Sequence, residues 1–115
     1  MTLPGGCEYF FGRSCRKDGT MADFSVLDEI YQVVVERKKN PKEGSYTNYL
    51  LDKGLDKICK KVGEEASEVI IAAKNNVNSE LQYEIADLIY HLSVLMVNQG
   101  LTWDDIINEL AKRRK

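Results

Sequence analysis

Apolar residues recur at helical spacing through residues 55–74, and this pattern constrains the fold more than any other feature of the chain. At about 100° per residue, these positions fall within an arc of roughly 120° around a helix axis. They are Leu55, Ile58, Cys59, Val62, Ala66, Val69, Ile70 and Ala73. The segment is therefore predicted to be a long amphipathic helix that turns one face to a core.

Two helices are predicted before this segment. Residues 25–40 carry apolar positions at helical spacing, with Ser25 as a candidate N-cap and Pro41 after the end. Residues 45–53 form a shorter helix that begins at Ser45 and stops before Gly54.

Two more helices are predicted after it. Residues 80–98 follow a candidate cap at Ser79, are apolar nearly all round, and end before Gly100, so this helix should be buried. The last helix starts at Thr102, which forms a capping-box pattern with Asp105. No strand pattern competes, and the predicted fold class is all-α, an antiparallel helical bundle.

The size and charge of the chain limit what it can do. A chain of 115 residues supports one domain, and a helix apolar on all sides favours a homodimer. The formal net charge of −2 gives no electrostatic reason to expect nucleic acid or an anionic membrane as partner. Neither a membrane span nor a signal peptide is recognisable, so the default location is cytoplasmic. The odd number of cysteines, three, argues against a disulfide framework or zinc site.

Residues 1–20 differ from the rest, because they hold four of the eight glycines and no periodic apolar face. We interpret them as a poorly ordered N-terminal extension whose deletion should leave folding and catalysis almost unchanged. The helical domain is then residues 21–115.

Acidic residues gather on two of the predicted helices. Glu64, Glu65 and Glu68 share one face of the helix at residues 55–74. Glu84 and Asp87 are spaced i, i+3 on the helix at residues 80–98, which has no lysine or arginine to offset their charge.

A solvated helix face is the ordinary explanation for the first acidic group taken alone. It suits Glu84 and Asp87 less well, because each would be desolvated among apolar neighbours. A divalent cation held by Glu65, Glu68, Glu84 and Asp87 removes that cost. Four carboxylates suit Mg²⁺, or Mn²⁺, rather than zinc.

Other polar residues near the acids have two interpretations each. His91 continues the row of Asp87 and is either a hydrogen-bonded core residue or a residue that fixes Asp87 or Glu84. Tyr46 and Tyr49 could stack on a nucleobase, but packing in the core is the favoured interpretation of both residues. Four lysines precede the acids and either form solvated surface or meet substrate phosphates. They are Lys53, Lys57, Lys60 and Lys61.

The pattern Glu64-Glu65-x-x-Glu68 followed by Glu84-x-x-Asp87 resembles the signature of the MazG-like all-alpha nucleotide pyrophosphatases. Within that superfamily, residues 26–113 resemble the phosphoribosyl-ATP pyrophosphatase family. The segments that carry this resemblance are SYTNYL at 45–50, KGLDKI at 53–58, KKVGEE at 60–65, IAAKN at 71–75 and DLIYH at 87–91.

The resemblance implies magnesium-dependent hydrolysis of phosphoribosyl-ATP to phosphoribosyl-AMP and pyrophosphate, the second step of histidine biosynthesis. It makes Glu64 the candidate to orient or deprotonate the attacking water, and it agrees with a homodimer. Bifunctional relatives also carry a cyclohydrolase domain, for which residues 1–20 are too short. The alternatives are a housekeeping nucleoside triphosphate pyrophosphatase of the same superfamily and a non-catalytic helical interaction module.

Overall fold

The computed structural model describes residues 23–114, and within that range every regular element is a helix. The helices are α1 (Ser25–Lys39), α2 (Tyr46–Lys53), α3 (Leu55–Lys74), α4 (Asn78–Gln99) and α5 (Trp103–Lys112). The all-α prediction is confirmed. The predicted extension at residues 1–20 lies outside the described residues.

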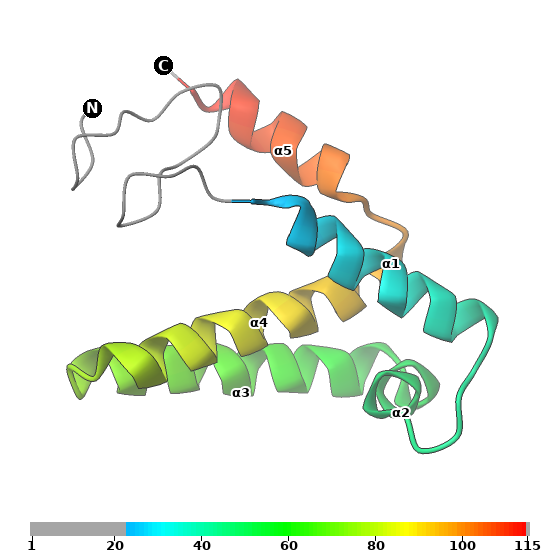
Figure 1. Ribbon diagram of the computed structural model, residues 1–115, viewed down its shortest axis with the longest axis horizontal. Helices are drawn as coiled ribbons and strands as arrows, with labels where there is room; N and C mark the ends of the chain where they lie inside the picture. The colour runs from blue at the N-terminus through cyan, green and yellow to red at the C-terminus, as the bar shows by residue number, and fades with distance from the viewer. Residues whose placement is uncertain (1–22, 115) are drawn as a thin grey trace.

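Helices α3 and α4 form a long antiparallel hairpin, which dominates the molecule in Figure 1. Helix α3 has the predicted bounds, because its apolar arc and its end at the asparagine-rich turn are both local signals. In the turn, Asn76 adopts a positive φ of 60°, a conformation that asparagine tolerates better than most residues. The short turn fixes the two helices side by side.

Local capping signals explain two of the helix starts. The Ser45 side chain accepts a hydrogen bond from the backbone N–H of Asn48 and begins α2. Thr102 and Asp105 form the predicted reciprocal capping box of α5. Gly100 ends α4 in the left-handed conformation, as predicted.

Two other predicted caps are wrong. Helix α1 already includes Ser25, whose backbone N–H donates to the carboxylate of Asp23. Helix α4 begins at Asn78, so Ser79 lies inside its first turn. In both cases the helix extends further toward its N-terminus than the serine indicated.

The core lies where α1, α2 and the open end of the hairpin meet. It consists of Val34, Leu50, Ile58, Val94 and Val97. Toward the turn, α3 and α4 contact only each other among the described helices. The prediction that all of α4 is buried is therefore wrong: Tyr83 is 68% exposed, because no described helix covers that half.

Helix α5 lies beyond α1 and is anchored mainly at its start (Figure 1). The indole N–H of Trp103 donates to the carbonyl of Leu27, and the Tyr31 hydroxyl donates to the carbonyl of Leu101. None of the residues of α5 is buried among the described residues. Of the helices described, none has the length and apolar character needed to cross a membrane.

Candidate metal centre and active site

Four carboxylates from the hairpin converge between α3 and α4. Glu65 and Glu68 come from α3, and Glu84 and Asp87 come from α4. One carboxylate oxygen of each lies within 4.8 Å of one oxygen of every other. We call this group the carboxylate tetrad, and its members are the four metal ligands predicted from the sequence.

Among the described residues, the negative charge of the tetrad is compensated only in part. Glu65 is buried, with 4% of its surface exposed. Glu65 Oε2 and Glu84 Oε2 are buried and have no hydrogen-bond partner among the described residues. Such atoms are costly to bury, whereas a divalent cation would use both. The donor set therefore fits a hard metal ion.

The surroundings of Asp87 raise the pKa of its carboxyl group. Burial raises the pKa of its carboxyl group above the usual value of 3.8, and a hydrogen bond to Glu65 and the charge of Glu65 raise it further. Close carboxylates favour a shared proton when no cation is present. The same arrangement favours exchange of that proton for a metal ion.

Lys61 is the only lysine or arginine among the described residues that pairs with the tetrad. Its ammonium nitrogen lies 3.5 Å from Glu65 Oε1 and 3.2 Å from Glu64 Oε2. The hydrogen bond to Glu64 raises the pKa of Lys61. Lys61 and Glu65 are spaced i, i+4 on α3.

Glu64 lies beside the tetrad and not within it. It is exposed, and the hydrogen bond from Lys61 lowers the pKa of its carboxyl group. The structure thus separates Glu64 from the four converging acids, in agreement with the ligand set predicted from the sequence, which leaves Glu64 out. A negatively charged carboxylate at the rim can hold or orient water.

His91 is buried and connects the tetrad to α2. Its Nδ1 lies 2.8 Å from the carbonyl oxygen of Asp87 and 3.5 Å from Asp87 Oδ1. Its Nε2 lies 3.0 Å from the hydroxyl of Tyr46. Both interpretations of His91 from the sequence describe part of what is seen, since it is a buried hydrogen-bonded residue that contacts Asp87.

Tyr46 and Tyr49 are 45% and 43% exposed, so the prediction that they pack in the core is wrong. Their rings stack at a centroid distance of 6.1 Å, and the Tyr46 ring also contacts the rings of Tyr90 and His91 on α4. The core position on that helix belongs to Leu50, and tertiary packing decides which face turns inward. Beside this pair, buried Thr47 and half-buried Tyr90 share a hydrogen bond, and partial burial raises the pKa of Tyr90.

The four predicted substrate lysines are spread along one side of the tetrad. Lys53 and Lys57 each hold their ammonium nitrogen 5.8 Å from the centroid of the Tyr49 ring. Lys60 is exposed on α3, and Lys61 reaches the tetrad itself. Three of these lysines therefore lie near Tyr49 or the tetrad, in a stretch that also carries the exposed acids Asp52 and Asp56.

The contact that sequence analysis missed is the one between Tyr46 and His91. The two residues are 45 positions apart, and nothing in the local sequence pairs them. A helical hairpin with four converging carboxylates and with lysines on its α2 side defines the class of all-helical nucleotide pyrophosphohydrolases.

Comparisons with known proteins make the assignment specific. The model of the family described as phosphoribosyl-ATP pyrophosphohydrolase matches residues 27–114. The chain is 69% identical over 87 residues to phosphoribosyl-ATP pyrophosphatase of Limosilactobacillus fermentum, covering 76% of this chain and 82% of the relative. It is 56% identical over 95 residues to the protein of that name from Clostridium novyi, covering 83% and 86%.

A third relative is longer. The histidine biosynthesis bifunctional protein HisIE of Thermoanaerobacter pseudethanolicus is 66% identical over 84 residues, which are 73% of this chain and 39% of the relative. The chain belongs to the phosphoribosyl-ATP pyrophosphohydrolase family. The family, the helical fold and the enzyme class predicted from the sequence are confirmed.

Proposed function

We propose that this chain hydrolyses phosphoribosyl-ATP between its α and β phosphates, using Mg²⁺ held by the carboxylate tetrad. The products are phosphoribosyl-AMP and pyrophosphate, and the reaction is the second step of histidine biosynthesis. The names of the relatives support this substrate and this pathway. The observation that carries the proposal is the set of converging carboxylates with two buried, unpartnered oxygens among the described residues.

Glu65, Glu68, Glu84 and Asp87 would hold the ion, since they supply only hard oxygen donors. Mn²⁺ has the same preference and is the expected substitute. When bound, the ion neutralises negative charge on the phosphate oxygens of the substrate.

The lysines act by binding phosphates. Lys61 is held by Glu64 and Glu65, and its raised pKa keeps it an ammonium ion. A substrate phosphate near the tetrad can replace these two carboxylates as the partner of the Lys61 ammonium group. Lys53, Lys57 and Lys60 lie further out and favour approach of a polyanion from the α2 end.

Glu64 orients the attacking water. Its position beside the tetrad and its exposure give it access to solvent near the scissile bond. Because its pKa is lowered, it remains a carboxylate but is a weak base. Hydrogen bonding to the water therefore suits Glu64 better than complete removal of a proton.

His91 supports the tetrad and does not touch the substrate. Its Nδ1–H donates to the backbone carbonyl of Asp87, which restrains the helical turn that follows the aspartate. A residue of this kind holds a ligand in place and tunes its affinity.

The working form is a homodimer in the cytoplasm. Support comes from exposed apolar residues on α5, including Ile107 and Leu110. Such surfaces in a small protein favour association with a second copy. The proposed partners are a second copy and the small-molecule substrate, without nucleic acid or membrane.

The test is hydrolysis by the purified chain of phosphoribosyl-ATP and a panel of ribo- and deoxynucleoside triphosphates, with and without Mg²⁺. We expect pyrophosphate release from phosphoribosyl-ATP far above that from the panel, and none after chelation. Equal or higher turnover of a common nucleoside triphosphate would instead identify a housekeeping pyrophosphatase. The Glu64→Gln variant should bind Mg²⁺ normally and lose turnover.

A further inference from the structure

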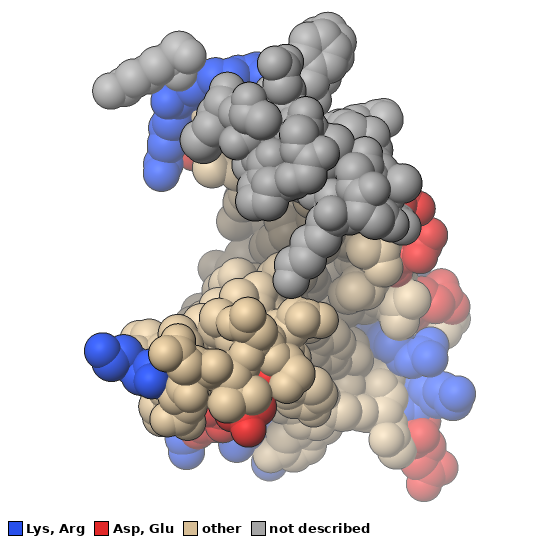
Figure 2. Space-filling model, turned by 60° about the vertical axis from the view of Figure 1, so that its left-hand side comes forward, with Lys and Arg blue, Asp and Glu red and all other residues tan. Residues whose placement is uncertain are grey.

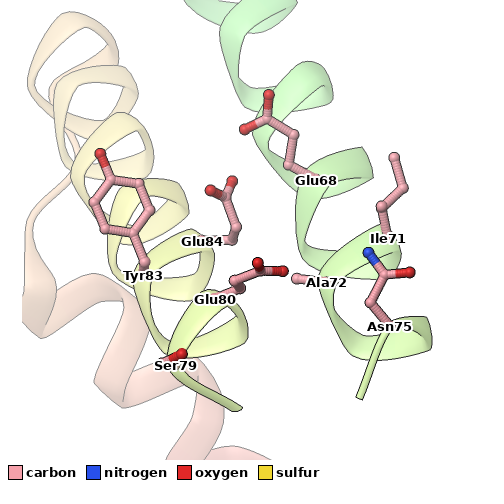
Figure 3. A pocket seen from close by; sticks show the side chains of 8 residues that line it. All are labelled: Glu68, Ile71, Ala72, Asn75, Ser79, Glu80, Tyr83 and Glu84. Carbon is pink, nitrogen blue, oxygen red and sulfur yellow. The ribbon is translucent and has the colours of Figure 1, made fainter. Parts of the chain in front are cut away.

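A groove runs along the hairpin from the carboxylate tetrad toward the turn (Figure 3). Its lining residues are Glu68, Ile71, Ala72, Asn75, Ser79, Glu80, Tyr83 and Glu84. Glu68 and Glu84 belong both to the tetrad and to this groove. A molecule held at the tetrad by its phosphates can therefore extend into the groove without leaving the protein surface.

The walls of the groove are suited to a flat organic ring. Ile71 and Tyr83 are 59% and 68% exposed, one on each helix, and Ala72 forms part of the α3 side. This end of the hairpin comes forward in Figure 2, where uncharged side chains cover most of its face and charged ones lie at its left and lower edges. Burial of such apolar surface favours ring binding.

The charge of the groove is opposite to that of the α2 side. Among its described lining residues there is no lysine or arginine, whereas Lys57 and Lys61 lie on the other side of the tetrad. Phosphate groups therefore prefer the α2 side. A neutral or positively charged group prefers the groove.

Glu80 gives the groove a negative group. It lies one turn before Glu84 on α4, and its side chain points between the helices in Figure 3. It forms no ion pair with any described residue and is not one of the four tetrad acids. A carboxylate beside an aromatic ring is a binding site for an organic cation.

We propose that this groove binds the base of the substrate as an N1-substituted adenine cation, and that Glu80 distinguishes it from unmodified adenine. The inference rests on the proposed function. A ribosyl group at N1 of adenine turns the amidine into a stronger base, so the ring carries a proton and a positive charge at neutral pH. The adenine of ATP is neutral under the same conditions. Tyr83 stacks on the cationic ring, and Glu80 accepts a hydrogen bond from its protonated exocyclic nitrogen.

The proposal is tested by binding without turnover. The probes are 1-methyl-AMP, whose base is cationic, and AMP, whose base is neutral, each titrated by calorimetry into the Mg²⁺-loaded protein. The parent should bind 1-methyl-AMP about tenfold or more tightly, as expected for one charge-assisted hydrogen bond. Glu80→Gln should remove this preference and lower kcat/KM for phosphoribosyl-ATP by a similar factor. Glu29→Gln, which removes an exposed carboxylate from α1, is the matched control and should keep both values.

A second variant separates stacking from packing. Tyr83→Leu keeps apolar surface but removes the aromatic face, so it should weaken binding of 1-methyl-AMP more than binding of AMP. It also tests the groove independently should Glu80→Gln unfold, which circular dichroism would reveal.

Three results would overturn the proposal. The first is equal affinity of the parent for the two nucleotides, and the second is a preference for 1-methyl-AMP that survives Glu80→Gln. The third is loss of the Mg²⁺-induced stabilisation in Glu80→Gln, which would make Glu80 a metal ligand. A parent that shows the preference but does not hydrolyse phosphoribosyl-ATP would refute the proposed function alone. A parent that hydrolyses it without the preference would refute the groove alone.

Discussion

The Tyr46 hydroxyl lies 3.0 Å from Nε2 of His91 and joins α2 to the helix that carries Glu84 and Asp87. Because a carbonyl oxygen only accepts hydrogen bonds, the contact between His91 Nδ1 and the Asp87 carbonyl places the proton on Nδ1. In the neutral ring, Nε2 is then the acceptor and Tyr46 the donor. The orientation of α2 is thereby connected to the tetrad.

Tyr46→Phe should destabilise the fold and reduce activity, because it leaves Nε2 of a buried histidine without its donor. We expect a loss of about 1 kcal/mol in the free energy of unfolding and a severalfold fall in kcat/KM. Urea denaturation and steady-state kinetics measure the two effects. Tyr49→Phe is the control, because the Tyr49 hydroxyl has no hydrogen bond with any described residue and the stacked ring is kept.

Glu84→Gln or Asp87→Asn should abolish most activity while the helical fold persists. Removal of a half-buried charge also removes its desolvation cost, so the metal-free variants should be at least as stable as the metal-free parent. Mg²⁺ should raise the melting temperature of the parent, because it binds only the folded state, and should do so much less in either variant. Glu29→Gln should behave as the parent; an equal Mg²⁺ response in all four proteins would rule out the tetrad as a metal site.

The pH dependence of stability should differ with and without metal. The pKa of Asp87 is raised by burial and by Glu65, so the folded, metal-free state holds that proton more tightly than the unfolded state. When a chelator has removed the metal, the free energy of unfolding of the parent should therefore fall as pH rises from below 3.8 through the raised pKa of Asp87. Asp87→Asn should show a smaller fall in melts recorded across that range. A parent that gains stability over the same range relative to Asp87→Asn would contradict this assignment.

The apolar side of α5 should form part of the dimer interface. Ile107 and Leu110 are 56% and 59% exposed on a helix that has no buried residue among those described. Leu110→Asp should shift the dimer toward monomer, because it places a charge in an apolar contact. Light scattering at micromolar concentration measures the shift, and Lys112→Gln, a change on the same helix without apolar loss, should leave the dimer intact. A monomeric parent would refute the proposed assembly.

Local sequence decided where along the chain the helices begin and end. The apolar arc of residues 55–74 gave the bounds of α3, the capping box gave the start of α5, and Gly100 gave the end of α4. These signals act between residues a few positions apart, so they can be read along the chain. The tetrad also followed from spacing, since acids on facing sides of an antiparallel hairpin must meet.

Only the tertiary structure decided which residues support the tetrad and what surrounds it. It left Tyr46 and Tyr49 partly exposed, joined Tyr46 to His91 and exposed Tyr83 beside the groove. Periodicity shows that a helix has an apolar face but does not say which neighbour covers it. Those contacts join residues far apart in sequence, and their geometry depends on how the helices pack against each other.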